Sequence, residues 1–183
     1  AMHGLGVGKS EMASLAGVKK TDLDFVLSGG VNEPVILAMA RVLDLDGKKL
    51  LASARREWTQ EPIQLNGLKQ FNLPFGTMQV NAYVLWEEGS RKAWCFDTGP
   101  DAKQILGFIH ANDLQLDAIF LTHTHRDHVA CLNELRENTG NPPFFVHKLE
   151  PIDGANLIEE GFEVQMDGFS LNSLHTHGHS IGG

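Results

Sequence analysis

The stretch LTHTHRDHVA, residues 121 to 130, places three histidines and one aspartate within six consecutive positions. The whole chain has 183 residues and only 9 histidines, so a large share of them stands here. Imidazole is the commonest neutral metal ligand in proteins, and its free pKa is close to physiological pH. Because half-polar rings are costly to crowd together unless something binds them, the stretch predicts a bound metal ion.

The predicted local structure gives each of these side chains a direction. The stretch lies between a predicted buried strand and the start of a predicted helix. In an extended segment, residues i and i+2 point the same way, so His123 and His125 can converge on one point. Asp127 and His128 stand where the chain turns into the helix, and they can face a second point nearby. The pattern suits one metal ion or two adjacent ions, and this ligand set is typical of zinc or iron.

Composition and charge narrow the class of protein. The hydrophobic content of 42% and the charged content of 21% are ordinary for a globular chain. A net charge of -8 does not indicate a nucleic-acid or acidic-membrane partner. Cys95 and Cys131 make no disulfide framework and are expected in the core. With neither a long apolar run nor a secretory signal in the sequence, we expect a cytoplasmic location and no membrane partner.

The hydrophobic pattern divides the chain into two parts. Residues 1 to 57 predict a small all-α domain, residues 58 to 66 a linker, and residues 67 to 183 an α/β domain. The helix signals in the first part are of two kinds. The expected N-caps are Ser10, Thr21 and Asn32, and Gly17 is expected to end the first helix.

The second part alternates strand and helix patterns. Two strands, 78 to 86 and 91 to 99, flank the turn EEGS and predict a hairpin. Asp167 and Gly168 predict the turn of a second hairpin within residues 162 to 176. Between the hairpins the pattern predicts, in order, a helix over 101 to 113, a strand over 116 to 121, a helix over 128 to 140 and a strand over 144 to 147.

A second histidine cluster stands near the end of the sequence, in LHTHGHSIGG, residues 174 to 183. It also follows a predicted strand, and Gly178 allows the backbone to turn tightly beside His179. His179 is therefore a candidate metal ligand. His175 and His177 alternate on a strand end, so either one can point outward, and both stay open as candidates.

The motifs together resemble a known family. HTHRDH at 123 to 128 matches the HxHxDH signature of the metallo-β-lactamase superfamily, and FDTG at 96 to 99 and THGHS at 176 to 180 follow the family's order. The similarity covers about residues 67 to 183. It implies an αββα sandwich with metal ions at one edge. The short form looks most like the hydroxyacylglutathione hydrolases, which are glyoxalase II-like thioesterases.

The resemblance also assigns residues. It implies that the first metal ion is bound by His123, His125 and His179, and the second by Asp127 and His128. Asp97 would hold the ligand loop from behind, as outer supports of metal sites do. The implied cofactor is zinc, one or two ions, with iron or manganese as alternatives.

This chain departs from the family at two places. His177 replaces the usual proline before Gly178, which makes it a further candidate ligand. The sequence ends four residues after His179, before the family's bridging aspartate and last histidine. We therefore expect the N-terminal half of the sandwich, truncated at its C-terminus, with at most one metal ion held firmly. An exposed sheet edge, or the helical domain, would then offer a surface for homo-oligomers.

Residues 12 to 51 resemble the helix-turn-helix of phage-repressor-type regulators. The recognition helix would begin near Lys19 and offers Lys20, but also Asp22 and Asp24. Phosphate contacts require basic groups, and acidic ones oppose them. A packing or dimerisation module without DNA binding is therefore the favoured interpretation.

Three function classes follow. The first is a hydrolase in which a metal-bound hydroxide attacks a thioester or another activated carbonyl, with Asp127 orienting the water. Its partner would be a small molecule such as a glutathione thioester. The second is a mononuclear iron dioxygenase of the persulfide-oxidising type, with His123, His179 and the family's bridging aspartate as a facial triad. The third is a DNA-binding sensor with a metal domain. We favour the first.

We predict that residues 1 to 60 bind no duplex DNA sequence-specifically, because lysines and aspartates are mixed on the candidate recognition helix. Fluorescence anisotropy of labelled duplexes with the full chain, at low and high salt, measures this. Tight binding to one DNA sequence with a steep salt dependence would contradict the prediction and support the DNA-binding sensor as the function.

Overall fold

A computed structural model describes residues 2–57, 65–166 and 168–183. They form two compact units. The first contains the described residues up to 57 together with 177–180, and the second contains 65–176 and 181–183. Most of the predicted linker, 58 to 64, lies outside the described residues.

Four helices make up the first unit: α1 (Lys9–Ala16), α2 (Lys20–Leu27), α3 (Glu33–Val42) and α4 (Gly47–Ala54). They enclose a core that includes Met12 and Leu23, both with 0% exposure. No described helix in either unit combines the length and apolar character that crossing a bilayer requires.

Two of the four expected helix signals are confirmed. Gly17 ends α1 in the left-handed conformation, with φ 65°, and the Asn32 side chain accepts a hydrogen bond from the Val35 amide at the start of α3. The expected N-caps Ser10 and Thr21 are wrong. Both helices begin earlier, at Lys9 and Lys20, because the extended residues before them are Gly8 and Lys19, which supply no capping side chain.

A six-stranded sheet forms the frame of the second unit, in the order β1-β2-β3-β4-β5-β6. The pairs β1–β2 and β2–β3 are antiparallel, whereas β3 to β6 run parallel to one another. A separate hairpin pairs β7 with β8. The bounds are β1 Leu68–Phe75, β2 Met78–Trp86, β3 Lys92–Phe96, β4 Gln115–Phe120, β5 Phe144–His147, β6 Asn156–Ile158, β7 Glu163–Met166 and β8 Phe169–Asn172; the helices are α5 Lys103–Ala111, α6 Arg126–Val129 and α7 Leu132–Glu137.

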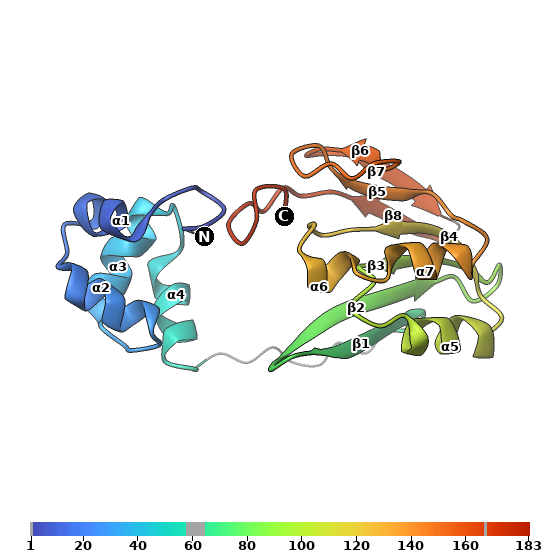
Figure 1. The fold of residues 1–183 in the computed structure, drawn as a ribbon, viewed down its shortest axis with the longest axis horizontal. Helices are drawn as coiled ribbons and strands as arrows, with labels where there is room; N and C mark the ends of the chain where they lie inside the picture. The colour runs from blue at the N-terminus through green and yellow to red at the C-terminus, as the bar shows by residue number, and fades with distance from the viewer. Residues whose placement is uncertain (1, 58–64, 167) are drawn as a thin grey trace. The chain divides into compact units, whose positions relative to one another are not determined.

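The sheet has an apolar layer on each face, as expected for parallel strands buried on both sides. Helices α5 and α7 cover one face, and Ile105 and Leu135 reach the core there with 0% exposure (Figure 1). On the other face, the ring of Phe120 stacks between those of Phe96 and Phe145, with centroids 5.4 and 4.9 Å away. Met166 of the β7–β8 hairpin joins this second cluster. The layers are helix, sheet and hairpin, an α/β fold.

The pattern predicted most of these elements, with one error and two omissions. Both hairpins, helix α5 and strands β4 and β5 are confirmed, although Asp167 itself lies outside the described residues. Strands β1 and β6 were not predicted. The single helix expected over 128 to 140 is wrong, because the chain forms α6 and α7 instead. The carbonyl of His128 accepts from the amide and the hydroxyl of Thr98, at 2.9 Å each, so a partner outside the helix occupies it.

We predict that Leu135→Ala destabilises the second unit by about 2–5 kcal/mol, because truncating a fully buried leucine leaves a cavity between α7 and the sheet. Urea denaturation followed by circular dichroism measures the free energy of unfolding. Leu174→Ala is the matched control, since its side chain is 75% exposed. Equal effects of the two substitutions would contradict this assignment of the core.

Candidate metal centre

Three parallel strands bring the candidate site together. The carboxyl ends of β3, β4 and β5 meet at one edge of the sheet, where open α/β sheets bind ligands. Asp97 follows β3 directly, and Thr122 and His123 follow β4 after one further residue. Residues that are distant in the sequence are therefore neighbours because of the parallel pairing.

Asp97 is the central acceptor of this edge. Its side chain is buried, and one oxygen, Oδ1, accepts from the Thr122 amide at 2.8 Å. The other, Oδ2, accepts from the Thr122 hydroxyl and lies 2.8 Å from His128 Nδ1. The carboxylate thus fixes the two ends of the loop 122 to 128.

The backbone around Asp97 is specialised for this position. Asp97 has φ 59°, in the left-handed region that aspartate tolerates better than most residues. Gly99 has φ 70°, and a Cβ there would lie 2.1 Å from Leu73 Cδ1. Within FDTG, the backbone conformation therefore favours Asp97 and Gly99, the close approach of Leu73 also favours Gly99, and Asp97 supplies the acceptor.

The hydrogen bonds fix the orientation of two candidate ligands. The Thr122 hydroxyl donates its only proton to Asp97, so at 3.0 Å it accepts from Nδ1 of His123. The Nδ1 of His128 donates to Asp97 in the same way. In both rings Nε2 is then the nitrogen with the lone pair, and a carboxylate or hydroxyl behind the ring is the usual support of a metal ligand.

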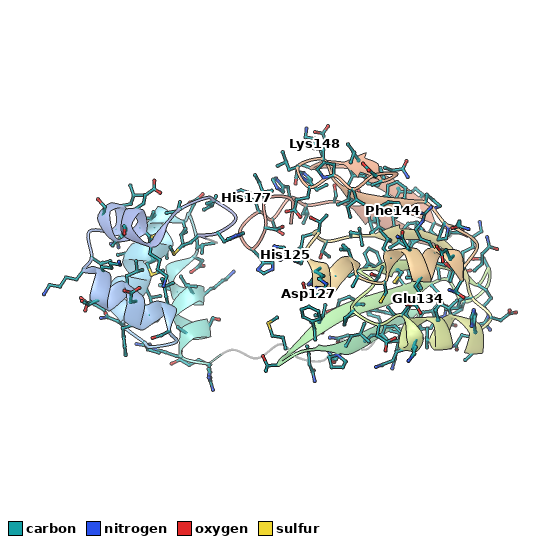
Figure 2. The ribbon with its side chains drawn as sticks, viewed as in Figure 1. His125, Asp127, Glu134, Phe144, Lys148 and His177 are labelled. Carbon is teal, nitrogen blue, oxygen red and sulfur yellow. The ribbon has the colours of Figure 1, made fainter. Side chains whose placement is uncertain are left out.

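The ligand candidates of the loop lie close to one another. The ring centroid of His123 is 4.5 Å from that of His125 and 4.1 Å from that of His128. Asp127 Oδ2 lies 3.5 Å from His128 Nε2. His125 and Asp127 both project from the turn where α6 begins (Figure 2). Imidazole nitrogens and a carboxylate at this spacing are a donor set that fits zinc or iron.

The three histidines proposed for the first metal ion differ in exposure: His123 is buried, His125 half-buried and His179 exposed. His177, the other candidate near His179, is exposed as well. Because His179 lies in the segment 177–180, which groups with the first unit, we infer the centre first from the loop 122 to 128.

The charge around His128 affects its protonation. Burial disfavours the charged imidazolium, but the hydrogen bond to Asp97 and the charges of Asp97 and Asp127 outweigh burial and raise the pKa of His128. A histidine whose folded pKa is raised stabilises the metal-free fold at acid pH, and this contribution is lost as the pH rises through the folded pKa. Metal binding at Nε2 would displace the proton, so acid pH opposes it.

A cavity of about 240 Å³ lies elsewhere in the second unit. Its walls include Phe96, Phe120 and Thr122, together with His147 and His175. It reaches the loop only at Thr122, and neither His123 nor His125 lines it. We therefore do not assign it to the metal centre, and His175, an open candidate from the sequence, belongs to this cavity.

The family model described as Metallo-beta-lactamase superfamily matches residues 75–183, which is more than half of the chain. The chain belongs to this superfamily. Among solved structures, the BLEG-1 B3 metallo-beta-lactamase is similar with 27% identity and a TM-score of 0.52, over 63% of this chain and 64% of that chain. ETHE1 from Myxococcus xanthus, at 23% identity with a TM-score of 0.55 over 63% of this chain and 50% of that chain, shares the fold.

Curated relatives in the superfamily are similar over part of their length. The probable metallo-hydrolase YqgX of Bacillus subtilis is 31% identical over 63% of this chain and 63% of the relative. The hydroxyacylglutathione hydrolase of Aeromonas hydrophila is 36% identical over 45% of this chain and 33% of the relative. The chain thus spans less than two thirds of either relative.

Two polar residues of the site were not predicted from the sequence. Thr122 connects Asp97 to His123, and Glu150 accepts from the amide and hydroxyl of Thr124. Thr122 could have been found, because it directly precedes the motif that identifies the loop. Glu150 gives no local signal, since it meets the loop only through the pairing of β4 with β5.

We predict that Asp97→Asn lowers the pKa of His128 in the metal-free protein, because the neutral amide removes the nearest negative charge. NMR titration of the imidazole C–H resonances measures it. The control is Asp153→Asn, which makes the same charge change at an exposed site. An unchanged His128 titration in Asp97→Asn would contradict the assigned hydrogen bond.

Proposed function

We propose that this chain belongs to a metal-dependent hydrolase that cleaves a thioester or another activated carbonyl. The observation that carries the proposal is the loop 122 to 128, where the rings of His125 and His128 lie 4.5 and 4.1 Å from that of His123. Asp97 holds His128 directly and His123 through Thr122. Building such a cluster of half-polar rings is explained by a bound cation. The names of the curated relatives, a metallo-hydrolase and hydroxyacylglutathione hydrolases, support hydrolysis.

The residues divide between two positions for metal ions. We propose His123, His125 and His179 for the first, and Asp127 with His128 for the second. Zinc is the expected ion, with iron or manganese as alternatives. When bound, the ion would supply Lewis acidity, which lowers the pKa of a coordinated water and polarises a carbonyl oxygen.

The chain's own groups would position and deprotonate the attacking water. Asp127 is half-buried at the start of α6, where its carboxylate can accept a hydrogen bond from water and then a proton. In a thioester, the water oxygen bonds to the acyl carbon and the carbon–sulfur bond breaks. The products are a carboxylic acid and a thiol, and the thiol carries the proton taken up by the leaving sulfur.

Hydroxyacyl thioesters of glutathione are the substrate class to test first. The relatives named hydroxyacylglutathione hydrolase include those of Vibrio campbellii and Hahella chejuensis, which are 31% and 35% identical to this chain over 56% and 60% of it. The matched regions cover only 41% and 42% of these two relatives, so the substrate is a proposal for the complete protein.

We predict that His125→Ala abolishes metal retention, because it removes half of the converging i, i+2 histidine pair. Asp127→Asn should keep one ion but lower turnover sharply, since an amide cannot take the proton of the water. Element-resolved mass spectrometry measures the bound metal, and a thiol-reactive dye follows thiol release from a hydroxyacylglutathione.

The control for both substitutions is His110→Ala, which removes an exposed imidazole at the end of α5. Full metal content and activity in His125→Ala would refute the metal centre. The dioxygenase would be supported instead of the hydrolase if the protein contained iron, took up oxygen with a persulfide substrate and released no thiol.

A further inference from the structure

Glu150 stands on the loop that follows β5, and its carboxylate joins two other loops. One oxygen, Oε2, accepts from both the amide and the hydroxyl of Thr124, at 2.8 Å each. The other, Oε1, accepts from the Gly182 amide at 2.7 Å. The two oxygens therefore serve different segments, which lie 58 residues apart in the sequence (182 minus 124).

Thr124 is the residue between two candidate metal ligands. His123 and His125 flank it, and their ring centroids lie 4.5 Å apart. In an extended segment the middle side chain points away from its two neighbours. Holding the amide and the hydroxyl of Thr124 on Glu150 therefore fixes the rotation of the backbone, and with it the side to which both histidines point.

Gly182 belongs to the base of the segment that carries His179. The two ends of that segment are tied together within the second unit, because the Thr176 amide donates to the Gly183 carbonyl at 2.6 Å and His175 Nε2 lies 2.8 Å from the Ile181 carbonyl. The hydrogen bond from Gly182 connects this base to Glu150. A Cβ at Gly182 would lie 3.1 Å from Glu150 Cγ, which is a tight contact, so Gly182 and Glu150 pack closely.

We propose that Glu150 is a positioning residue that directs His123 and His125 to the same side before the metal binds, by fixing Thr124 between them. The proposal rests on the metal centre proposed above, and it adds what holds the ligand loop in place and connects it to residues 181–183. A carboxylate is required because three hydrogen-bond donors meet it. A glutamine at this position would present one NH2 group, which donates and cannot accept from them.

The competing interpretation is that Glu150 only stabilises the fold. A structural role would change the melting temperature of the metal-free protein without changing the affinity of the folded protein for metal. A positioning role changes the affinity itself, and it changes the ligand field of a bound cobalt(II) ion, which reports on coordination geometry.

The test is a competitive chelator titration with zinc alone, together with the visible spectrum of the cobalt(II) form. We expect Glu150→Gln to weaken zinc binding 10–100-fold, the usual range for outer supports of metal ligands, and to shift the cobalt(II) bands. The control Glu159→Gln makes the same charge change at an exposed residue that pairs with Lys148. It should bind zinc like the unmodified chain.

A second pair of variants keeps the test decisive if Glu150→Gln does not fold. Thr124→Val removes the hydroxyl donor and Thr124→Ser keeps it, and we expect only the valine variant to weaken zinc binding. Unchanged affinity and spectrum in folded Glu150→Gln, or in Thr124→Val, would overturn the proposal. An equal loss in Glu159→Gln would overturn it too, by assigning the effect to net charge.

The two proposals fail in different ways. Loss of zinc in His125→Ala but not in Glu150→Gln leaves the metal centre intact and removes the positioning role. Full zinc binding in His125→Ala removes the metal centre itself and the positioning role with it.

Discussion

The second unit depends on one buried carboxylate. Asp97 is 3% exposed, so its negative charge is tolerable only because donors surround it: the amide and hydroxyl of Thr122 and the ring of His128. Those donors come from a loop 25 to 31 residues further along the chain. The need to satisfy one carboxylate therefore fixes the loop that carries the candidate ligands. Thr98, next to Asp97, binds the His128 carbonyl, and the helix breaks after α6 because that carbonyl is occupied.

A second carboxylate acts on the same loop from the neighbouring strand. Strand β4 lies between β3 and β5, so the loop after it is flanked by Asp97 on one side and by Glu150 on the other. The sequence THTH alternates accordingly. The hydroxyl of each threonine, Thr122 and Thr124, reaches one of the two carboxylates, whereas the two histidine rings approach each other. The threonines of the motif are thus as necessary to the geometry as the histidines.

Local signals made part of this predictable from the sequence. The i, i+2 spacing of His123 and His125 and the turn residues of the hairpins act over a few positions, and they predicted the loop and most strands. Two of the features that the sequence did not predict depend on distant partners. The helix break after α6 follows from Thr98, and the role of Glu150 follows from the pairing of β5 with β4. Strand β6 has only three residues, too few for a period-two pattern to show.

The two carboxylates also hold the backbone of this loop through contacts within the protein. Asp97 and Glu150 make six hydrogen bonds or ring contacts to the segments described above, three each. Ordering a loop costs roughly 1–2 kcal/mol of backbone entropy per residue, and a ligand that must order its own site binds more weakly by that amount. When protein hydrogen bonds hold the backbone of the loop, the histidines are already directed, and less ordering of the loop is left to the binding of a cation.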